Sequence, residues 1–95
     1  MNISVIGTGY VGLVTGATLA NSGNKVTCLD LIKSKIDELN KGKSPIFEPG
    51  LEELITIGIK KGNLKGSTEI ESGILDSDVT FICVGTPSNK CNVTI

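Results

Sequence analysis

The sequence contains no histidine and no tryptophan, and its only aromatic residues are Tyr10, Phe47 and Phe81. Without histidine, neither a Ser-His-Asp nor a Cys-His catalytic arrangement can be built from these 95 residues. Three aromatic rings are too few for the stacking surfaces that bind single-stranded nucleic acid. The net charge is only -1, and no run of like charge is present to attract a nucleic acid or an anionic membrane. We therefore expect no nucleic-acid partner.

Cysteine is also scarce, with Cys28, Cys83 and Cys91 as its only occurrences. An odd number without C-x-x-C spacing argues against a disulfide framework and against a zinc site. Cys28 and Cys83 fall in predicted strands, where a free cysteine packs as a small apolar residue. Cys91 falls in a predicted loop, where nothing nearby would activate its thiol. We therefore expect no bound metal and a reduced, cytoplasmic protein.

The first 24 residues lack charge altogether. A membrane span is one interpretation, because Gly12 and Gly16 match the small-xxx-small pattern of packed membrane helices. However, polar residues are spread through this stretch, and Gly7 and Gly9 would weaken a spanning helix. A secretory signal would need a basic start, which is absent. We therefore predict no membrane association.

This N-terminus contains a short apolar run, residues 3–6, followed by three glycines with the spacing G-x-G-x-x-G. The pattern predicts a strand, a tight turn and the start of a helix. In the dinucleotide-binding fingerprint, the first glycine (Gly7) makes the turn, the second (Gly9) lets the backbone approach a pyrophosphate, and the third (Gly12) lets the helix pack on the strand. The helix would direct its free N–H groups and the positive end of its dipole at the phosphates.

The glycine motif indicates a dinucleotide site only together with an acidic residue about 20 positions further on, at the end of a second strand. Residues 25–30 supply that strand and Asp30 supplies that acid. Its carboxylate can accept both hydroxyl protons of an adenosine ribose and would repel a 2′-phosphate, so the pattern favours NAD over NADP. Three alternatives stay open: an FAD site, because Gly16 extends the motif to G-x-G-x-x-G-x-x-x-G; a non-catalytic module that only senses a nucleotide; and Asp30 as a mere helix cap.

Helix and strand patterns alternate along the rest of the chain. We expect helices over residues 11–21, 34–40 and 51–61, a helical turn over 70–75, and strands over 3–6, 25–30, 64–68 and 79–84, with Gly66 weakening the third strand. This alternation is typical of an α/β fold with a doubly wound parallel sheet of Rossmann type. Ligands bind beyond the carboxyl ends of such strands, where residues 7–12, Asp30 and residues 85–88 would meet. For residues 85–87, an ordinary strand-exit turn is the alternative.

Four stretches together resemble the N-terminal part of the UDP-glucose/GDP-mannose dehydrogenase family: GTGYVGLVTG at residues 7–16, Asp30 followed by Lys35, SPIFEPGLEEL at 44–54, and VGTP at 84–87. The resemblance covers nearly the whole chain. It implies an NAD site with three parts: Gly7, Thr8, Gly9, Tyr10, Val11 and Gly12 at the pyrophosphate; Asp30 and Lys35 beside the adenosine ribose; and Val84, Gly85, Thr86, Pro87 and Ser88 on the nicotinamide side. For Lys35, a solvated position on a helix surface is an equal alternative.

The resemblance also implies the chemistry of a longer parent enzyme. This is an NAD-dependent, four-electron oxidation of a sugar C6 alcohol to a carboxylate, by way of an aldehyde and a cysteine-bound thioester. In the family, the nucleophilic cysteine, the assisting lysine and the sugar-nucleotide pocket lie beyond residue 95. None of the three cysteines here matches the nucleophile's motif, so we expect no catalytic residue in this chain.

We therefore expect residues 1–95 to be an incomplete, N-terminal NAD-binding Rossmann domain without its substrate domain. The parent enzyme is expected to be a homo-oligomer acting on UDP-glucose, with GDP-mannose as the alternative. The sequence departs from the family pattern after Ser88, so no element is predicted there. An incomplete sheet should also keep an unpaired edge and an uncovered apolar face.

Overall fold

A five-stranded sheet organises the chain, for which a computed structural model describes residues 1–44, 48–83 and 92–94. The elements are β1 (Asn2–Ile6), α1 (Tyr10–Asn21), β2 (Lys25–Leu29), α2 (Lys33–Asn40), α3 (Leu51–Lys60), β3 (Leu64–Ser67), α4 (Ile70–Leu75), β4 (Val79–Ile82) and β5 (Asn92–Thr94). The strand order is β3-β2-β1-β4-β5. Strands β1 to β4 are parallel, whereas β5 pairs with β4 in the antiparallel direction.

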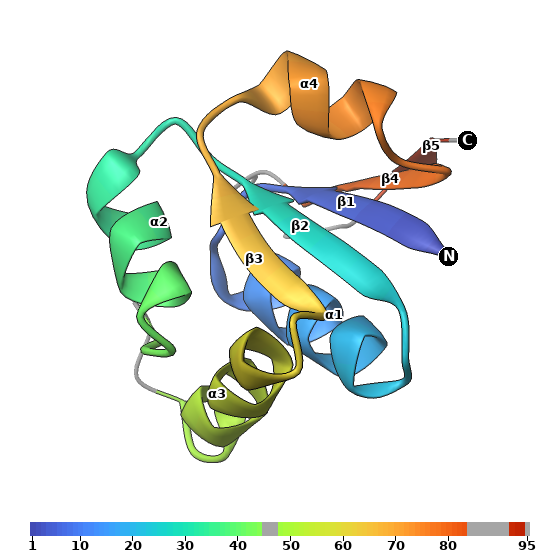
Figure 1. Ribbon diagram of the computed structural model, residues 1–95. Helices are drawn as coiled ribbons and strands as arrows, with labels where there is room; N and C mark the ends of the chain where they lie inside the picture. The colour runs from blue at the N-terminus through green and yellow to red at the C-terminus, as the bar shows by residue number, and fades with distance from the viewer. Residues whose placement is uncertain (45–47, 84–91, 95) are drawn as a thin grey trace.

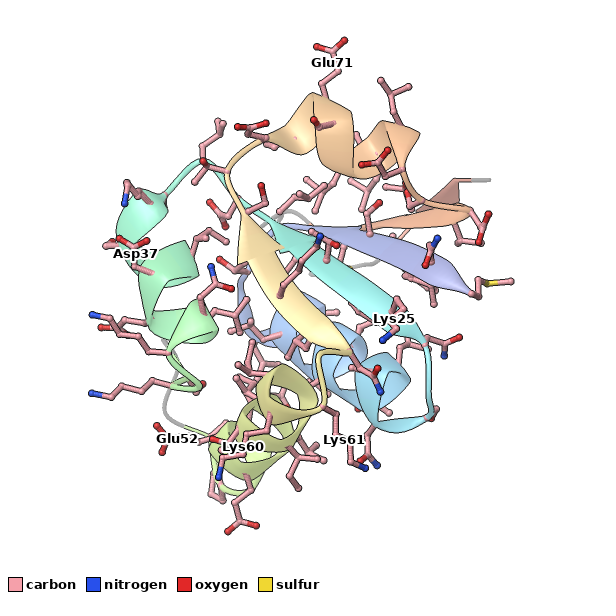
Figure 2. All side chains as sticks on the ribbon, in the orientation of Figure 1. Lys25, Asp37, Glu52, Lys60, Lys61 and Glu71 are labelled. Carbon is pink, nitrogen blue, oxygen red and sulfur yellow. The ribbon has the colours of Figure 1, made fainter. Side chains whose placement is uncertain are left out.

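Helices cover both faces of this sheet. Helices α1 and α3 lie on one face, α4 lies on the other, and α2 lies beside β3 (Figure 1). The main core forms where α1 and α3 meet the sheet, around side chains that are almost fully buried, among them Val5, Leu13, Cys28 and Ile55. Charged side chains such as Lys60 point outward from the helices (Figure 2). The predicted doubly wound α/β fold is therefore confirmed.

The short strand β5 is the main departure from the expected topology. It consists of only three residues, Asn92–Thr94, which is too short for any hydrophobic alternation to be recognised in the sequence. Strand β5 lies in the segment for which no element was predicted, and the expected parallel pairing is confirmed for β1 to β4. The four parallel strands and four helical segments lie within one or two residues of the predicted ranges wherever they can be compared, whereas the end of the predicted strand at Val84 lies outside the described residues.

The two cysteines that the structure describes differ in their bonding state. Cys28 is free and buried between β2 and α1, and burial raises the pKa of its thiol to about 12, as expected for an unreactive core residue. Cys83 is disulfide-bonded, so the expectations that it is free and that all the cysteines are reduced were wrong. An odd number of cysteines excludes complete pairing but not a single bond. Cys91 lies outside the described residues.

The outer edge of β3 is closed at one point by a side chain of α2. Asn40 Nδ2 donates to the Gly66 carbonyl at 3.1 Å, and the Gly66 amide donates to Asn40 Oδ1 at 2.8 Å. The side-chain amide therefore makes both hydrogen bonds that a neighbouring strand would make at this residue. A Cβ on Gly66 would lie 3.0 Å from Leu39, so the glycine that weakened the strand prediction is what lets α2 pack here. The expected unpaired edge is thus partly closed.

Candidate functional site

The first two strands end next to each other, at the edge where the sequence predicts a ligand. Ile6, the last residue of β1, pairs with Leu29, the last residue of β2. The Gly7 amide continues this pairing by donating to the Leu29 carbonyl at 2.8 Å. The glycine loop after β1 and Asp30 after β2 therefore lie side by side at the carboxyl edge of the sheet.

Two of the three glycines are required by the fold itself. Gly7 has a φ of 100°, which side chains of L-residues rarely adopt. A Cβ on Gly12 would lie only 2.0 Å from the Gly7 carbonyl oxygen. The glycine at Gly7 therefore makes the turn, and the glycine at Gly12 lets α1 approach it.

Gly9 is different, because nothing in the described protein requires a glycine there. Its φ is -76°, an ordinary value, and a Cβ built on it would have no atom within 4 Å. The residue is exposed at the start of α1. Open space above the middle glycine is what the close approach of a pyrophosphate to the backbone needs.

The N-terminus of α1 is also suited to an anion. Gly9 is its N-cap, no side chain caps the helix, and its first turn contains no acidic residue. The amides of Tyr10, Val11 and Gly12 precede the first intrahelical hydrogen bond, which the Leu13 amide makes to Gly9. These N–H groups and the helix dipole favour a negative charge at the same position as the open space over Gly9.

The Asp30 carboxylate accepts hydrogen bonds from the glycine loop after β1 and from the start of α2. Its Oδ2 accepts hydrogen bonds from the Thr8 amide at 2.9 Å and from the Thr8 hydroxyl at 2.6 Å. Its Oδ1 accepts the amide of Ile32, the N-cap residue of α2, at 3.0 Å. The carboxylate therefore joins the glycine loop to the start of α2.

The environment of Asp30 favours its charged form. Partial burial raises the pKa of the carboxyl, but the hydrogen bonds from Thr8 and Ile32 and the charge of Lys35 lower it, and the net pKa is below its ordinary value. Lys35 is half-buried on α2. The structure thus brings the predicted residues 7–12, Asp30 and Lys35 to one edge.

Residues 84–88, predicted for the nicotinamide side, lie outside the described residues. Strand β4, which precedes them, runs parallel to β1, and the Cys83 amide donates to the Ile6 carbonyl at 2.8 Å. Sequence reasoning missed the contacts of Thr8 and Ile32 with Asp30. A hydroxyl residue directly after the first glycine was the available signal for one of them.

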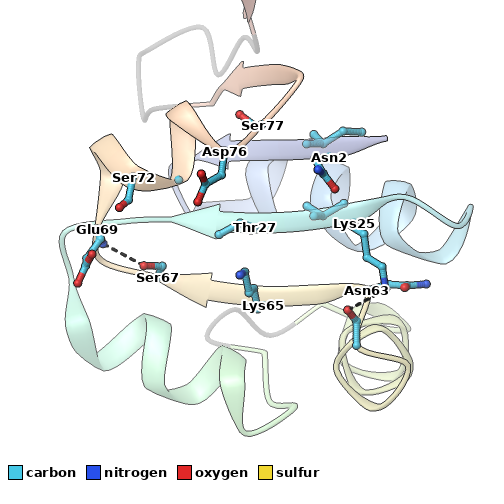
Figure 3. Close-up of a pocket in the computed structure, with 14 residues that line it drawn as sticks. Asn2, Lys25, Thr27, Asn63, Lys65, Ser67, Glu69, Ser72, Asp76 and Ser77 are labelled. Atoms are coloured by element: carbon cyan, nitrogen blue, oxygen red, sulfur yellow. Dashed lines mark hydrogen bonds between the residues drawn. The ribbon is translucent and has the colours of Figure 1, made fainter.

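A polar groove of about 570 Å³ lies elsewhere, over the face of the sheet that α4 covers (Figure 3). Its lining includes Lys25, Thr27, Lys65 and Asp76, and none of the predicted site residues belongs to it. This groove lies over β1, β2 and β3 only, so the uncovered apolar face expected of an incomplete sheet stays a prediction. A helix that spans a membrane would have to be longer and more apolar than any helix in the described ranges. No group of three or more possible metal ligands occurs in those ranges.

Comparison with known proteins decides between the nucleotide cofactors. The model of the UDP-glucose/GDP-mannose dehydrogenase family, NAD binding domain, matches residues 1–94. The chain belongs to this family. The resemblance found in its motifs is therefore confirmed, and the predicted cofactor, NAD, is that of the family domain, in place of NADP or FAD.

Relatives with two different sugar substrates are similar to this NAD-binding domain. It is 58% identical to UDP-glucose 6-dehydrogenase YwqF of Bacillus subtilis, over 95% of the chain and 20% of the relative. It is 52% identical to GDP-mannose 6-dehydrogenase of Pseudomonas aeruginosa, over 95% of the chain and 21% of the relative. A crystal structure of a ternary complex of GDP-mannose dehydrogenase from P. aeruginosa superimposes with a TM-score of 0.89 at 47% identity, covering 97% of the chain and 22% of that structure. The chain thus spans about a fifth of the length of these relatives.

Proposed function

We propose that residues 1–95 are the N-terminal, NAD-binding part of a longer enzyme that oxidises the C6 alcohol of a nucleotide sugar. The overall reaction converts R–CH2OH, two NAD+ and water into R–COO−, two NADH and three protons. The family of the domain and the dehydrogenases that it resembles support this proposal. The share of those relatives that the chain covers supports a longer parent with a separate substrate domain.

The observation that carries the proposal for the site is the open space over Gly9. The fold does not need a glycine there, but a pyrophosphate at the N-terminus of α1 does. In this proposal, residues 7–12 hold the pyrophosphate, while Asp30 and Lys35 lie beside the adenosine ribose. Residues 84–88 remain the predicted nicotinamide side. When bound, NAD supplies the hydride acceptor, and this chain supplies binding and orientation.

UDP-glucose is the proposed substrate, because a UDP-glucose 6-dehydrogenase is 58% identical to this chain. GDP-mannose is the second candidate, supported by relatives that are 47–52% identical to the chain. The choice depends on a sugar and base pocket that we expect outside these residues. A homo-oligomeric, cytoplasmic parent enzyme is part of the same proposal.

The test is turnover by the full-length protein, with UDP-glucose and GDP-mannose offered separately and NADH formation followed by absorbance. Two NADH formed for each UDP-glucose consumed is the expected result. Turnover of GDP-mannose alone would replace the substrate and keep the reaction. Binding of NAD without turnover of any nucleotide sugar would point to a nucleotide-sensing module, and a failure to bind NAD would refute the proposed site.

A further inference from the structure

Thr8 occupies a variable position of the glycine motif, yet it is one of the most buried polar residues of the described chain. Only 1% of its surface is exposed. Its hydroxyl and its amide both donate to a single atom, Oδ2 of Asp30, at 2.6 and 2.9 Å. Its side chain is therefore turned toward the carboxylate and is not free to bind a phosphate.

These bonds determine which acceptor sites of the Asp30 carboxylate remain free. An ionised carboxylate has about four lone-pair sites, two on each oxygen. The two bonds from Thr8 fill both sites on Oδ2, and the Ile32 amide fills one site on Oδ1. One acceptor site on Oδ1 is left for a ligand, where the sequence had suggested that both oxygens could accept ribose hydroxyls.

We propose that Thr8 is a positioning residue that fixes the Asp30 carboxylate, so that its single free acceptor site selects a ribose hydroxyl over a 2′-phosphate. This inference rests on the proposed NAD site at this edge. A hydroxyl can donate into the free site, whereas a 2′-phosphate brings like charge and further acceptor oxygens. Without the hydroxyl bond, Oδ2 keeps only the bond from the residue 8 amide, so the carboxylate is held less firmly and can rotate away from the position in which it repels the phosphate.

The test compares Thr8→Val, which keeps the branched shape and removes the hydroxyl, with Thr8→Ser, which keeps the hydroxyl. Dissociation constants for NAD and NADP are measured by calorimetry on the full-length protein. We expect Thr8→Val to weaken NAD binding roughly tenfold, because hydrogen bonds to charged groups are strong enough for such a change, and to reduce the preference for NAD over NADP. Thr8→Ser is expected to retain both.

Thr80→Val provides the matched control. Thr80 is a second buried threonine, and its hydroxyl bonds to Ser4 Oγ at 2.8 Å, so the substitution removes a buried hydroxyl bond that does not involve Asp30. Thermal melts should show a loss of stability for Thr80→Val as well as for Thr8→Val. Only Thr8→Val should change the preference between the two cofactors.

A cycle with Asp30→Ala separates this inference from the proposed site. If Thr8 acts through Asp30, Thr8→Val should change NAD affinity little once Asp30 is alanine. Should Asp30→Ala weaken NAD while Thr8→Val leaves the cofactor preference unchanged, the role of Thr8 is refuted and the site stands. If Asp30→Ala has no effect on either cofactor, the proposed site itself fails. Should Thr8→Val not fold, Thr8→Ala removes the same hydroxyl with less crowding, and its result decides in the same way.

Discussion

Replacing Gly9 with alanine separates what the fold requires from what the cofactor requires. The new methyl group would point into space that has no protein atom within 4 Å, and the φ of -76° suits alanine. Alanine restricts the unfolded chain, which stabilises a protein by about 0.4–1 kcal/mol. Alanine is also a poorer N-cap than glycine, which costs about 0.5–1 kcal/mol. The two effects nearly cancel, so we expect stability to change by less than about 1 kcal/mol.

Binding of NAD should respond very differently. If the pyrophosphate lies against the Gly9 backbone, the methyl group overlaps it. Crowding of this kind typically costs about 1–3 kcal/mol in packed interiors, which corresponds to a roughly tenfold to hundredfold loss of affinity. Gly12→Ala should behave in the opposite way: its Cβ would lie 2.0 Å from the Gly7 carbonyl oxygen, so the protein itself should lose more than about 3 kcal/mol.

The assay combines thermal melts with calorimetric titration of NAD, using the full-length protein and both alanine variants. The expected pattern is a stable Gly9→Ala protein that binds NAD poorly and a strongly destabilised Gly12→Ala protein. A Gly9→Ala protein that binds NAD as tightly as the original would show that the pyrophosphate does not lie over Gly9. A melt as low as that of Gly12→Ala would show that the fold does require the middle glycine.

Three further predictions follow from the same structure. The pKa of the Asp30 carboxyl is lowered in the folded state, so its contribution to stability is complete well above the ordinary pKa of 3.8 and is lost as the pH falls through the lower, folded-state pKa. Acid unfolding followed by circular dichroism should therefore be less steep in Asp30→Asn. Asn40→Ala leaves the Gly66 amide and carbonyl without their side-chain partner, so denaturant titration should show a loss of about 1–3 kcal/mol, and an unchanged midpoint would mean that water replaces the amide without loss. The isolated 95-residue chain should form no NADH from UDP-glucose, because the predicted nucleophile and sugar pocket lie elsewhere, and measurable NADH production would contradict this.

The parallel part of the fold was predictable because each of its elements carries a local signal. Apolar runs mark the buried strands, and positive-φ glycines such as Gly23 and Gly62 follow the ends of α1 and α3. Strand β5 has no such signal, since it is three residues long and depends on pairing with β4. The disulfide at Cys83 could likewise not be predicted from the sequence, because cysteine pairing depends on distances in space and not on spacing in the sequence.

The candidate site was predictable to the level of the motif but not to the level of its hydrogen bonds. The glycine spacing and the position of Asp30 are read directly from the chain, because turn geometry and strand length fix them. Thr8 stands at a position that the motif leaves variable, so its hydroxyl was visible in the sequence, but its bonds to Asp30 depend on β1 and β2 lying side by side. For the same reason, the sequence overestimated the acceptor sites that Asp30 can offer to a ribose.

The hydrogen bonds of Asp30 affect how any substitution of this residue should be interpreted. Its carboxylate links the loop that carries the glycines to the start of α2, through Thr8 on one oxygen and Ile32 on the other. In the proposed site, Asp30→Ala therefore removes a ribose ligand and also releases the glycine loop and the start of α2 from each other. The loss of NAD affinity in that variant contains both effects, and it exceeds the strength of the ribose contact by whatever the loops lose in order. Thr8→Val keeps the carboxylate and loses only the hydroxyl bond, while the backbone amides of residues 8 and 32 still donate to Asp30. The difference between the two variants is therefore an upper limit for the ribose contact.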